Sequence, residues 1–282
     1  MQQGSVMRCV RRVLRVGVTG LVVFVAACTS TGTDGQYQPV RAQHGKDVMW
    51  IPTPDTLVTK MLEMAQLSSS DLLYDLGAGD GKIPIEAARR YGATAVGIEY
   101  NPEMAQFARE NVKNAGVQSK VTIVTGDIFE ENFSHADVLT LYLLESINVK
   151  LKPQILAMRP GTRVVSNSFR MGAWQPDQVV TVDNGWSAYL WVVPSQIQGT
   201  WKVSGGAMPA GELGLKQIFQ HFEGTLRTSE GKVIPVQGHL DGPRVFLEST
   251  DTAKTVARQR FLVKGDQWID AETGLEIARK TN

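Results

Sequence analysis

A glycine-rich turn between a short apolar segment and an amphipathic one constrains this chain more than any other feature. Residues 72–76 are mostly apolar, the Gly-Ala-Gly-Asp-Gly turn follows at 77–81, and residues 82–91 have a helical period that ends at Gly92. Glycines let the backbone turn sharply and approach a ligand closely, and the helix that follows directs its amino-terminal end toward that ligand. The pattern predicts a strand, a tight turn and a helix, with a binding site at the turn.

Strand-like and helix-like segments alternate along the first half of the chain. Short apolar runs occur at 72–76, 95–99, 121–125 and 137–143, and helical patterns separate them. Such alternation is typical of βαβ units in a parallel sheet. Asn184-Gly185 then separates two further strand-like runs and predicts a hairpin. We therefore expect an α/β fold, a Rossmann-like doubly wound sheet that is mostly parallel and ends in an antiparallel hairpin.

The amino terminus has the layout of an export signal. Four arginines lie within residues 8–15 and precede an apolar run at 16–27, which is shorter than the roughly 20 residues that a spanning helix needs. The run ends in Val-Ala-Ala before Cys28, which resembles the lipobox of bacterial lipoproteins. That resemblance implies cleavage before Cys28 and a lipid on its side chain. The alternative is an ordinary cleaved signal in which Cys28 has no role.

Composition divides the remaining chain into three parts. Residues 29–46 are polar, rich in Gly, Thr and Gln, and without an apolar period, which is typical of a tether. After Pro194, strand-like pieces alternate with Gly and Asp turns and predict a separate small antiparallel β domain. The expected organisation is a signal peptide at 1–27, a lipidated cysteine and tether at 28–46, a ligand-binding domain at 47–195 and a β-rich domain at 196–282.

Charge and cysteine content exclude several classes of partner. The only cysteines are Cys9 and Cys28, and Cys9 lies in the predicted signal peptide, so the mature protein has no pair for a disulfide. The chain has 29 basic and 28 acidic residues, and loss of residues 1–27 removes four basic ones, leaving a net charge of about −3. We expect no nucleic-acid partner. The four histidines lack ligand spacing, so no metal site is predicted.

Acidic residues at the turn discriminate between ligand classes. Dinucleotide-binding folds have their third glycine one residue later, where this chain has Lys82, and Asp80 in the loop would repel a pyrophosphate. S-adenosylmethionine has no phosphate and carries a sulfonium and an ammonium, for which Asp75 and Asp80 are electrostatically suitable. The turn therefore favours S-adenosylmethionine, and a nicotinamide-dependent oxidoreductase is the disfavoured alternative.

Two further acidic positions follow the next strands. Glu99 ends the second strand, 20 residues after Gly79, where a carboxylate can accept hydrogen bonds from both hydroxyls of a ribose. Asp127 and Ile128 follow the third strand, where the acid can hold the amino group of an adenine and the apolar side chain can cover its face. The acids at three successive strand ends would contact one adenosine-bearing ligand.

Together these motifs resemble those of the class I, or seven-β-strand, S-adenosylmethionine-dependent methyltransferases, over roughly residues 50–195. Segments 51–54, 74–81 and 141–144 are most similar to the seven-stranded protein-lysine methyltransferases, which include the mitochondrial ATP-synthase c-subunit and adenine-nucleotide-carrier enzymes. The resemblance implies that the cofactor-binding residues are Thr53, Asp75, Gly77, Ala78, Gly79, Gly81, Glu99, Asp127 and Ile128. It also implies that Tyr142 lines the channel to the acceptor as a candidate catalytic residue, although a tyrosine packed at a strand end is an equal alternative.

The function expected from these residues is S-adenosylmethionine-dependent methyl transfer to an amine or other nucleophile of a protein side chain or small molecule. Methyltransferases that act on amides and adenine have an Asn/Asp-Pro-Pro-Tyr tetrad after the fourth strand. This sequence lacks the tetrad at that place, which argues against those acceptors. The alternative is a non-catalytic envelope lipoprotein that keeps the fold as a ligand-binding or interaction module. The expected location is the bacterial cell envelope, where a lipid on Cys28 anchors the protein to the periplasmic face of the outer membrane. S-adenosylmethionine is made in the cytoplasm and is not expected there.

Overall fold

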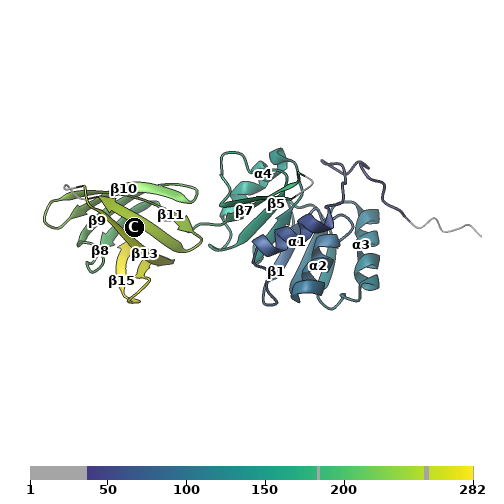
Figure 1. Cartoon of the computed structure of the whole chain (residues 1–282), viewed down its shortest axis with the longest axis horizontal. Helices are drawn as coiled ribbons and strands as arrows, with labels where there is room; N and C mark the ends of the chain where they lie inside the picture. Colours follow the sequence, from purple (N-terminus) through teal and green to yellow (C-terminus); the bar gives the residue numbers. More distant parts are fainter. Residues whose placement is uncertain (1–36, 183–184, 251–253, 282) are drawn as a thin grey trace, which may run out of the picture. The chain divides into compact units, whose positions relative to one another are not determined.

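The structure is a computed structural model that describes residues 37–182, 185–250 and 254–281. Its first sheet contains β1 (Leu72–Leu76), β2 (Thr94–Glu99), β3 (Val121–Thr125), β4 (Val138–Leu141), β5 (Arg163–Asn167), β6 (Gln178–Thr181) and β7 (Ser187–Val192). The order across this sheet is β3-β2-β1-β4-β5-β7-β6 (Figure 1). β1 to β5 pair in parallel, whereas β7 is antiparallel to both β5 and β6. The predicted doubly wound sheet with its terminal antiparallel hairpin is confirmed.

The strand order determines where a ligand can bind. β2 and β3 lie on one side of β1, and β4 and β5 lie on the other side. The chain therefore reverses its direction of winding between β1 and β4. In open sheets of this kind, the crevice beyond the carboxyl ends of the strands at such a reversal is where ligands bind.

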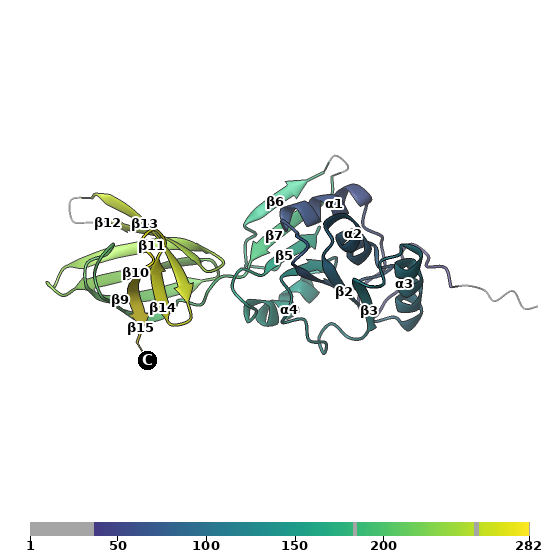
Figure 2. The same ribbon diagram turned by 90° about the horizontal axis from the view of Figure 1, so that it is seen from below.

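Three helices cover one face of this sheet and a fourth covers the other. The helices are α1 (Asp55–Met64), α2 (Lys82–Tyr91), α3 (Pro102–Asn114) and α4 (Glu145–Leu156). Side chains of α1, α2 and α3 share one buried cluster with the sheet, and those of α4 belong to a second cluster. Figure 2 shows α4 on the opposite side of the strands from α1 and α2.

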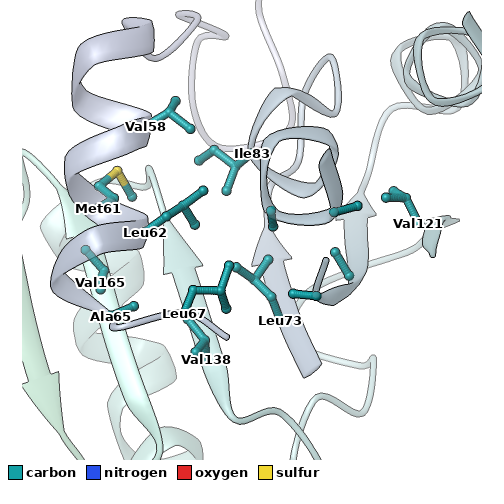
Figure 3. Packing of buried hydrophobic residues seen from close by; sticks show 14 of the residues in the cluster. Val58, Met61, Leu62, Ala65, Leu67, Leu73, Ile83, Val121, Val138 and Val165 are labelled. Carbon is teal, nitrogen blue, oxygen red and sulfur yellow. The ribbon is translucent and has the colours of Figure 1, made fainter. Parts of the chain in front are cut away.

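The first buried cluster brings together residues that are far apart in the sequence. Leu62 of α1 and Ile83 of α2 are close to Leu73 of β1 (Figure 3), and all three are at most 5% exposed. Each fully buried aliphatic side chain of this kind contributes roughly 1.5–3 kcal/mol relative to an exposed one. This packing holds the start of α2, and with it the glycine turn, against the end of β1.

The Thr53-Pro54 pair predicts a helix with Thr53 as N-cap and Pro54 as its first residue, but Pro54 is the N-cap of α1. The Thr53 hydroxyl accepts a hydrogen bond from the Asn167 side-chain amide at 3.3 Å instead. The sequence also predicts a kink or a late helix start at Pro153. α4 begins at Glu145, well before Pro153, so the late start is wrong, and the proline lies in the last turn of the helix.

The carboxyl-terminal strands form a closed antiparallel barrel, which confirms the predicted small β domain. Its strands are β8 (Gly199–Val203), β9 (Gly211–Ile218), β10 (His221–Thr228), β11 (Val233–Asp241), β12 (Arg244–Thr250), β13 (Val256–Lys264), β14 (Gln267–Asp270) and β15 (Glu276–Lys280). Trp201, Phe261 and Trp268 are at most 1% exposed in its core, and the two tryptophan rings have centroids 5.3 Å apart. The pairing of β15 with β8 closes the barrel, so none of its eight described strands is left as an unpaired edge.

Several predictions concern residues outside the described ranges. These are the signal peptide at 1–27, the lipid on Cys28, the first part of the tether at 28–36, and Asn184 of the hairpin turn. Within the described ranges, no helix combines the length and the apolar character that crossing a membrane requires.

Candidate active site

The glycine turn is tied to the end of the neighbouring strand. The backbone amides of Gly77 and Ala78 both donate to the carbonyl of Ile98 at 2.9 Å, and the amide of Gly79 donates to Oε2 of Glu99 at 2.9 Å. Gly77 and Gly79 have φ angles of 83° and 54°, which glycine adopts without steric cost. These bonds hold the loop after β1 beside the acidic end of β2.

Gly97 in β2 is a structural requirement of this turn that the sequence analysis missed. A Cβ atom at Gly97 would lie 2.7 Å from the Cβ of Ala78 and 2.8 Å from Cδ1 of Ile123. The turn can therefore approach β2 only because residue 97 has no side chain. An isolated glycine inside a strand pattern often marks a close approach of two backbone segments. This pattern could have predicted the role of Gly97.

A cavity of about 320 Å³ opens at the carboxyl ends of β1 to β4, and nine of the ten predicted site residues line it. They are Thr53, Asp75, Gly77, Ala78, Gly79, Glu99, Asp127, Ile128 and Tyr142. Gly81 does not line the cavity. With a φ of 79° it is the N-cap of α2, and its Cβ position would lie 3.3 Å from Ala108, so its role is to let α2 begin close to α3.

Asp75 is a buried carboxyl group at the end of β1. It is 3% exposed, and its Oδ1 accepts a hydrogen bond from the Thr140 hydroxyl at 2.7 Å. Burial raises the pKa of Asp75 to about 7, and the negative charges of Asp80 and Glu99 act in the same direction. Burial also raises the pKa of Asp80. A cation placed between these carboxyl groups would stabilise their ionised forms.

The raised pKa of Asp75 predicts a pH-dependent stability of the ligand-free protein. The pKa of Asp75 is higher in the folded state than in the unfolded state. Its contribution to folding stability is therefore fully present below about pH 4 and is lost as the pH rises through 7. Each unit of pKa shift is worth about 1.4 kcal/mol. Between pH 5 and pH 7.5 we expect Asp75→Asn to lose less thermal stability than the wild type, as measured by melting temperature. An equal loss of melting temperature in the two proteins would contradict the raised pKa of Asp75.

Thr53 is positioned by a lysine from the start of α2. Nζ of Lys82 donates to the Thr53 carbonyl at 3.0 Å and to Oδ1 of Asp55 at 2.9 Å. The Thr53 hydroxyl accepts from the side-chain amide of Asn167, a buried residue at the end of β5. These contacts join the segment before α1 to the start of α2 and the end of β5, so Thr53 lies on the wall of the cavity.

The two remaining acids follow β2 and β3. Oε1 of Glu99 accepts from the Asn101 amide at 2.9 Å, in addition to the bond from Gly79 to Oε2. Oδ1 of Asp127 accepts from the Phe129 amide at 3.0 Å, and its Oδ2 accepts from Nζ of Lys46 at 2.5 Å. The Lys46 ammonium lowers the pKa of Asp127. Both carboxylates are therefore held in fixed orientations toward the cavity.

A segment that precedes α1 forms one wall of the cavity, and sequence analysis did not anticipate it. Residues 43–51 all line the cavity, and backbone bonds from Ala42 to Trp50 and from Trp50 to Gln43 close them into a hairpin-like turn. Part of this wall, up to Lys46, falls within the predicted tether. No local pattern pointed to it, because its partners are Asp127 and the glycine turn, far away in sequence.

The residues of the cavity fit S-adenosylmethionine. Four carboxyl groups, those of Asp75, Asp80, Glu99 and Asp127, line a volume suited to one small ligand. They complement a sulfonium, an ammonium and hydroxyl donors, whereas a phosphate at the turn would meet Asp80. Among the described residues, no group of three His, Cys, Asp or Glu side chains could hold a metal ion.

Comparison with known proteins agrees with this chemistry. A family model described as the ANTKMT methyltransferase domain matches residues 75–178, which lie within the seven-stranded sheet and its helices. A protein-lysine N-methyltransferase from Saccharolobus islandicus is 42% identical over 151 residues, which make up 52% of this chain and 94% of that protein. The mouse adenine nucleotide translocase lysine N-methyltransferase is 32% identical over 38% of this chain and 48% of its own length.

A solved structure extends the comparison to the ligand. The crystal structure of an RNA methyltransferase from Salinibacter ruber in complex with S-adenosyl-L-homocysteine has 49% sequence identity and a TM-score of 0.51. The match covers 52% of this chain and 96% of that one. These similarities favour an enzyme over a non-catalytic envelope lipoprotein, and its methyl donor is S-adenosylmethionine. The chain belongs to the class I S-adenosylmethionine-dependent methyltransferases, and residues 75–178 match an ANTKMT-type methyltransferase domain.

Proposed function

We propose that this methyltransferase modifies the ε-amine of lysine in a protein acceptor. The observation that carries the proposal is the 42% identity with a protein-lysine N-methyltransferase across 94% of that protein. The Salinibacter relative is an RNA methyltransferase, so RNA is the rival acceptor. Loss of the predicted signal peptide would leave a net negative chain, which does not favour an RNA partner.

The proposed donor site follows the acids along the strand ends. Asp75 and Asp80 face the positively charged amino-acid part of S-adenosylmethionine, Glu99 accepts from its ribose hydroxyls, and Asp127 accepts from the amino group of its adenine. Lys46 now holds the Oδ2 atom that the adenine needs. A carboxylate oxygen accepts two hydrogen bonds, so Asp127 can bind the adenine amino group while it keeps Lys46.

The residues of this site mainly align two reactants. Bound S-adenosylmethionine supplies a methyl carbon already activated by its sulfonium, so the protein needs no nucleophile of its own. Burial raises the pKa of Tyr142, so its phenol stays protonated and is available as a hydrogen-bond donor on the wall of the cavity. The acceptor amine must arrive neutral, and a less polar mouth favours loss of its proton.

The proposed location remains the bacterial envelope, with a lipid on Cys28 after cleavage of residues 1–27. In this organisation the tether leads into the cavity wall at residues 43–46, and the methyltransferase domain at 47–195 precedes the β domain at 196–282. A lipid anchor would bring the acceptor site close to membrane proteins. It also requires a supply of methyl donor on the side of the membrane where the enzyme resides.

Radiolabel transfer tests the acceptor. Full-length protein in detergent is incubated with tritiated S-adenosylmethionine and bacterial envelope proteins, and the products are hydrolysed and separated as amino acids. We expect the label to co-migrate with methylated lysine, and Asp75→Ala to abolish labelling. Label in RNA, in methyl esters or in methylarginine would overturn the lysine proposal.

A further inference from the structure

Three aromatic side chains surround the acceptor end of the cavity. The ring of Tyr142 lies 6.3 Å from that of Phe169, with 28° between their planes, and 5.7 Å from that of Trp186, with 75° between their planes. All three side chains are partly exposed. Tyr142 and Phe169 line the donor cavity itself, and Trp186 extends the aromatic surface beyond Tyr142.

The strand order places these rings away from the nucleoside half of the donor site. Tyr142 follows β4, Phe169 follows β5 and Trp186 precedes β7, whereas the ribose and adenine acids follow β2 and β3. β1 lies between the two groups of strands. The aromatic residues therefore lie on the side of Asp75 opposite to Glu99 and Asp127, where an acceptor has to enter.

A strained turn holds Phe169 in this position. Ser168 has a φ of 63°, which is uncommon for a residue other than glycine, and its hydroxyl donates to Oδ1 of Asn167 at 2.8 Å. The side-chain amide of the buried Asn148 donates to the Phe169 carbonyl at 3.4 Å and to the Arg170 carbonyl at 3.2 Å. Strain of this kind persists where surrounding contacts over-determine it, and it is common at functional sites.

We propose that Tyr142, Phe169 and Trp186 form a binding site for the alkylammonium group of the acceptor, which on the proposed function is the lysine side chain before and after methylation. Aromatic faces attract ammonium ions through their quadrupoles, which favours a cation over a neutral group of the same shape. The butyl stem of lysine packs against the same rings, as expected for an amphipathic side chain.

The angles between the rings favour a compact cation over a flat base. A nucleobase needs parallel faces, whereas Trp186 meets Tyr142 nearly edge to face and the planes of Phe169 and Tyr142 are inclined by 28°.

Ligand-observed NMR on the full-length protein saturated with S-adenosylhomocysteine tests this site. The probes are Nα-acetyl-lysine methylamide, its Nε-trimethyl form, the neutral Nα-acetyl-norleucine methylamide and the nucleoside cytidine. We expect both cationic probes to bind at least about 3-fold more tightly than norleucine, in line with one cation–π interaction. Phe169→Leu and Trp186→Leu should each reduce this preference. Because Trp186 does not line the donor cavity, Trp186→Leu should also change the affinity for S-adenosylhomocysteine by less than about 2-fold.

The matched control is Phe246→Leu, which removes an aromatic ring from the β12 strand of the barrel, where it stacks on His239, and should leave all affinities unchanged. Equal binding of lysine and norleucine, or tighter binding of cytidine than of lysine, would overturn the alkylammonium site. Failure of S-adenosylhomocysteine to bind would instead overturn the donor assignment. In that case the same titrations on the ligand-free protein still decide the aromatic site.

Discussion

Gly79→Arg is expected to abolish binding of S-adenosylmethionine, with an affinity loss of more than about 100-fold. A Cβ atom at this position would lie 2.5 Å from Nε1 and 2.9 Å from Cδ1 of Trp50, a residue of the cavity wall. The longer arginine side chain would fill the cavity and bring a positive charge to a site built for a cation. The backbone φ of 54° adds a smaller conformational cost for any residue other than glycine.

Isothermal titration with S-adenosylmethionine measures the loss. Gly116→Arg is the matched control, because Gly116 has a similar φ of 70° and no atom lies within 4 Å of its Cβ position. It introduces the same charge and the same backbone strain without entering the cavity. The control should bind the donor normally, and circular dichroism should show both variants folded. Retained affinity in Gly79→Arg would contradict the position of the donor site.

Glu99→Ala is expected to weaken donor binding by about 100-fold. The carboxylate now orients two loops by accepting from the amides of Gly79 and Asn101, and on our assignment it also accepts from the ribose. A hydrogen bond to a charged group is worth about 1.5–3 kcal/mol, so loss of one or two such bonds yields an effect of this size. Glu99→Gln keeps the size of the side chain but loses its charge, and should be intermediate.

The matched control for Glu99 is Glu103→Ala. Glu103 lies four residues later, in the first turn of α3, and is exposed. Removing it changes the net charge equally but touches no cavity residue, so donor affinity should change by less than about 2-fold. An equal effect of both substitutions would indicate that overall charge, and not a specific ribose contact, supports binding.

Local pattern was enough to predict the doubly wound sheet. The apolar runs of β1 to β4 and the glycines that end α2 and α3 agree with the tertiary packing, so each boundary was close to that observed. The barrel was less predictable. Residues 211–218 form β9 although they mix Lys, Gln, Glu and Gly with apolar residues, because pairing on both sides stabilises this strand.

The site was predictable wherever a residue's role follows from its place after a strand. Asp75, Glu99 and Asp127 were identified because the carboxyl ends of parallel strands meet at one edge of a sheet. Lys46 and Trp50 were missed because the chain before α1 folds back over the donor site, and no periodicity marks such a contact. Phe169 was missed, and packing rather than substrate contact was the predicted role of Trp186, because only the antiparallel pairing of β5 with β7 brings the two residues near Tyr142.

The chemistry of the donor pocket follows from the sequence alone, since small residues at a strand-to-helix turn and acids at three strand ends act through their spacing along the chain. Folding in three dimensions sets which segment forms the wall of the pocket, how Asp75 acquires its raised pKa, and which rings lie near Tyr142. Those properties depend on burial and on contacts between residues separated by tens of positions. Burial and long-range contact arise from the folded chain as a whole, so local sequence patterns do not encode them individually.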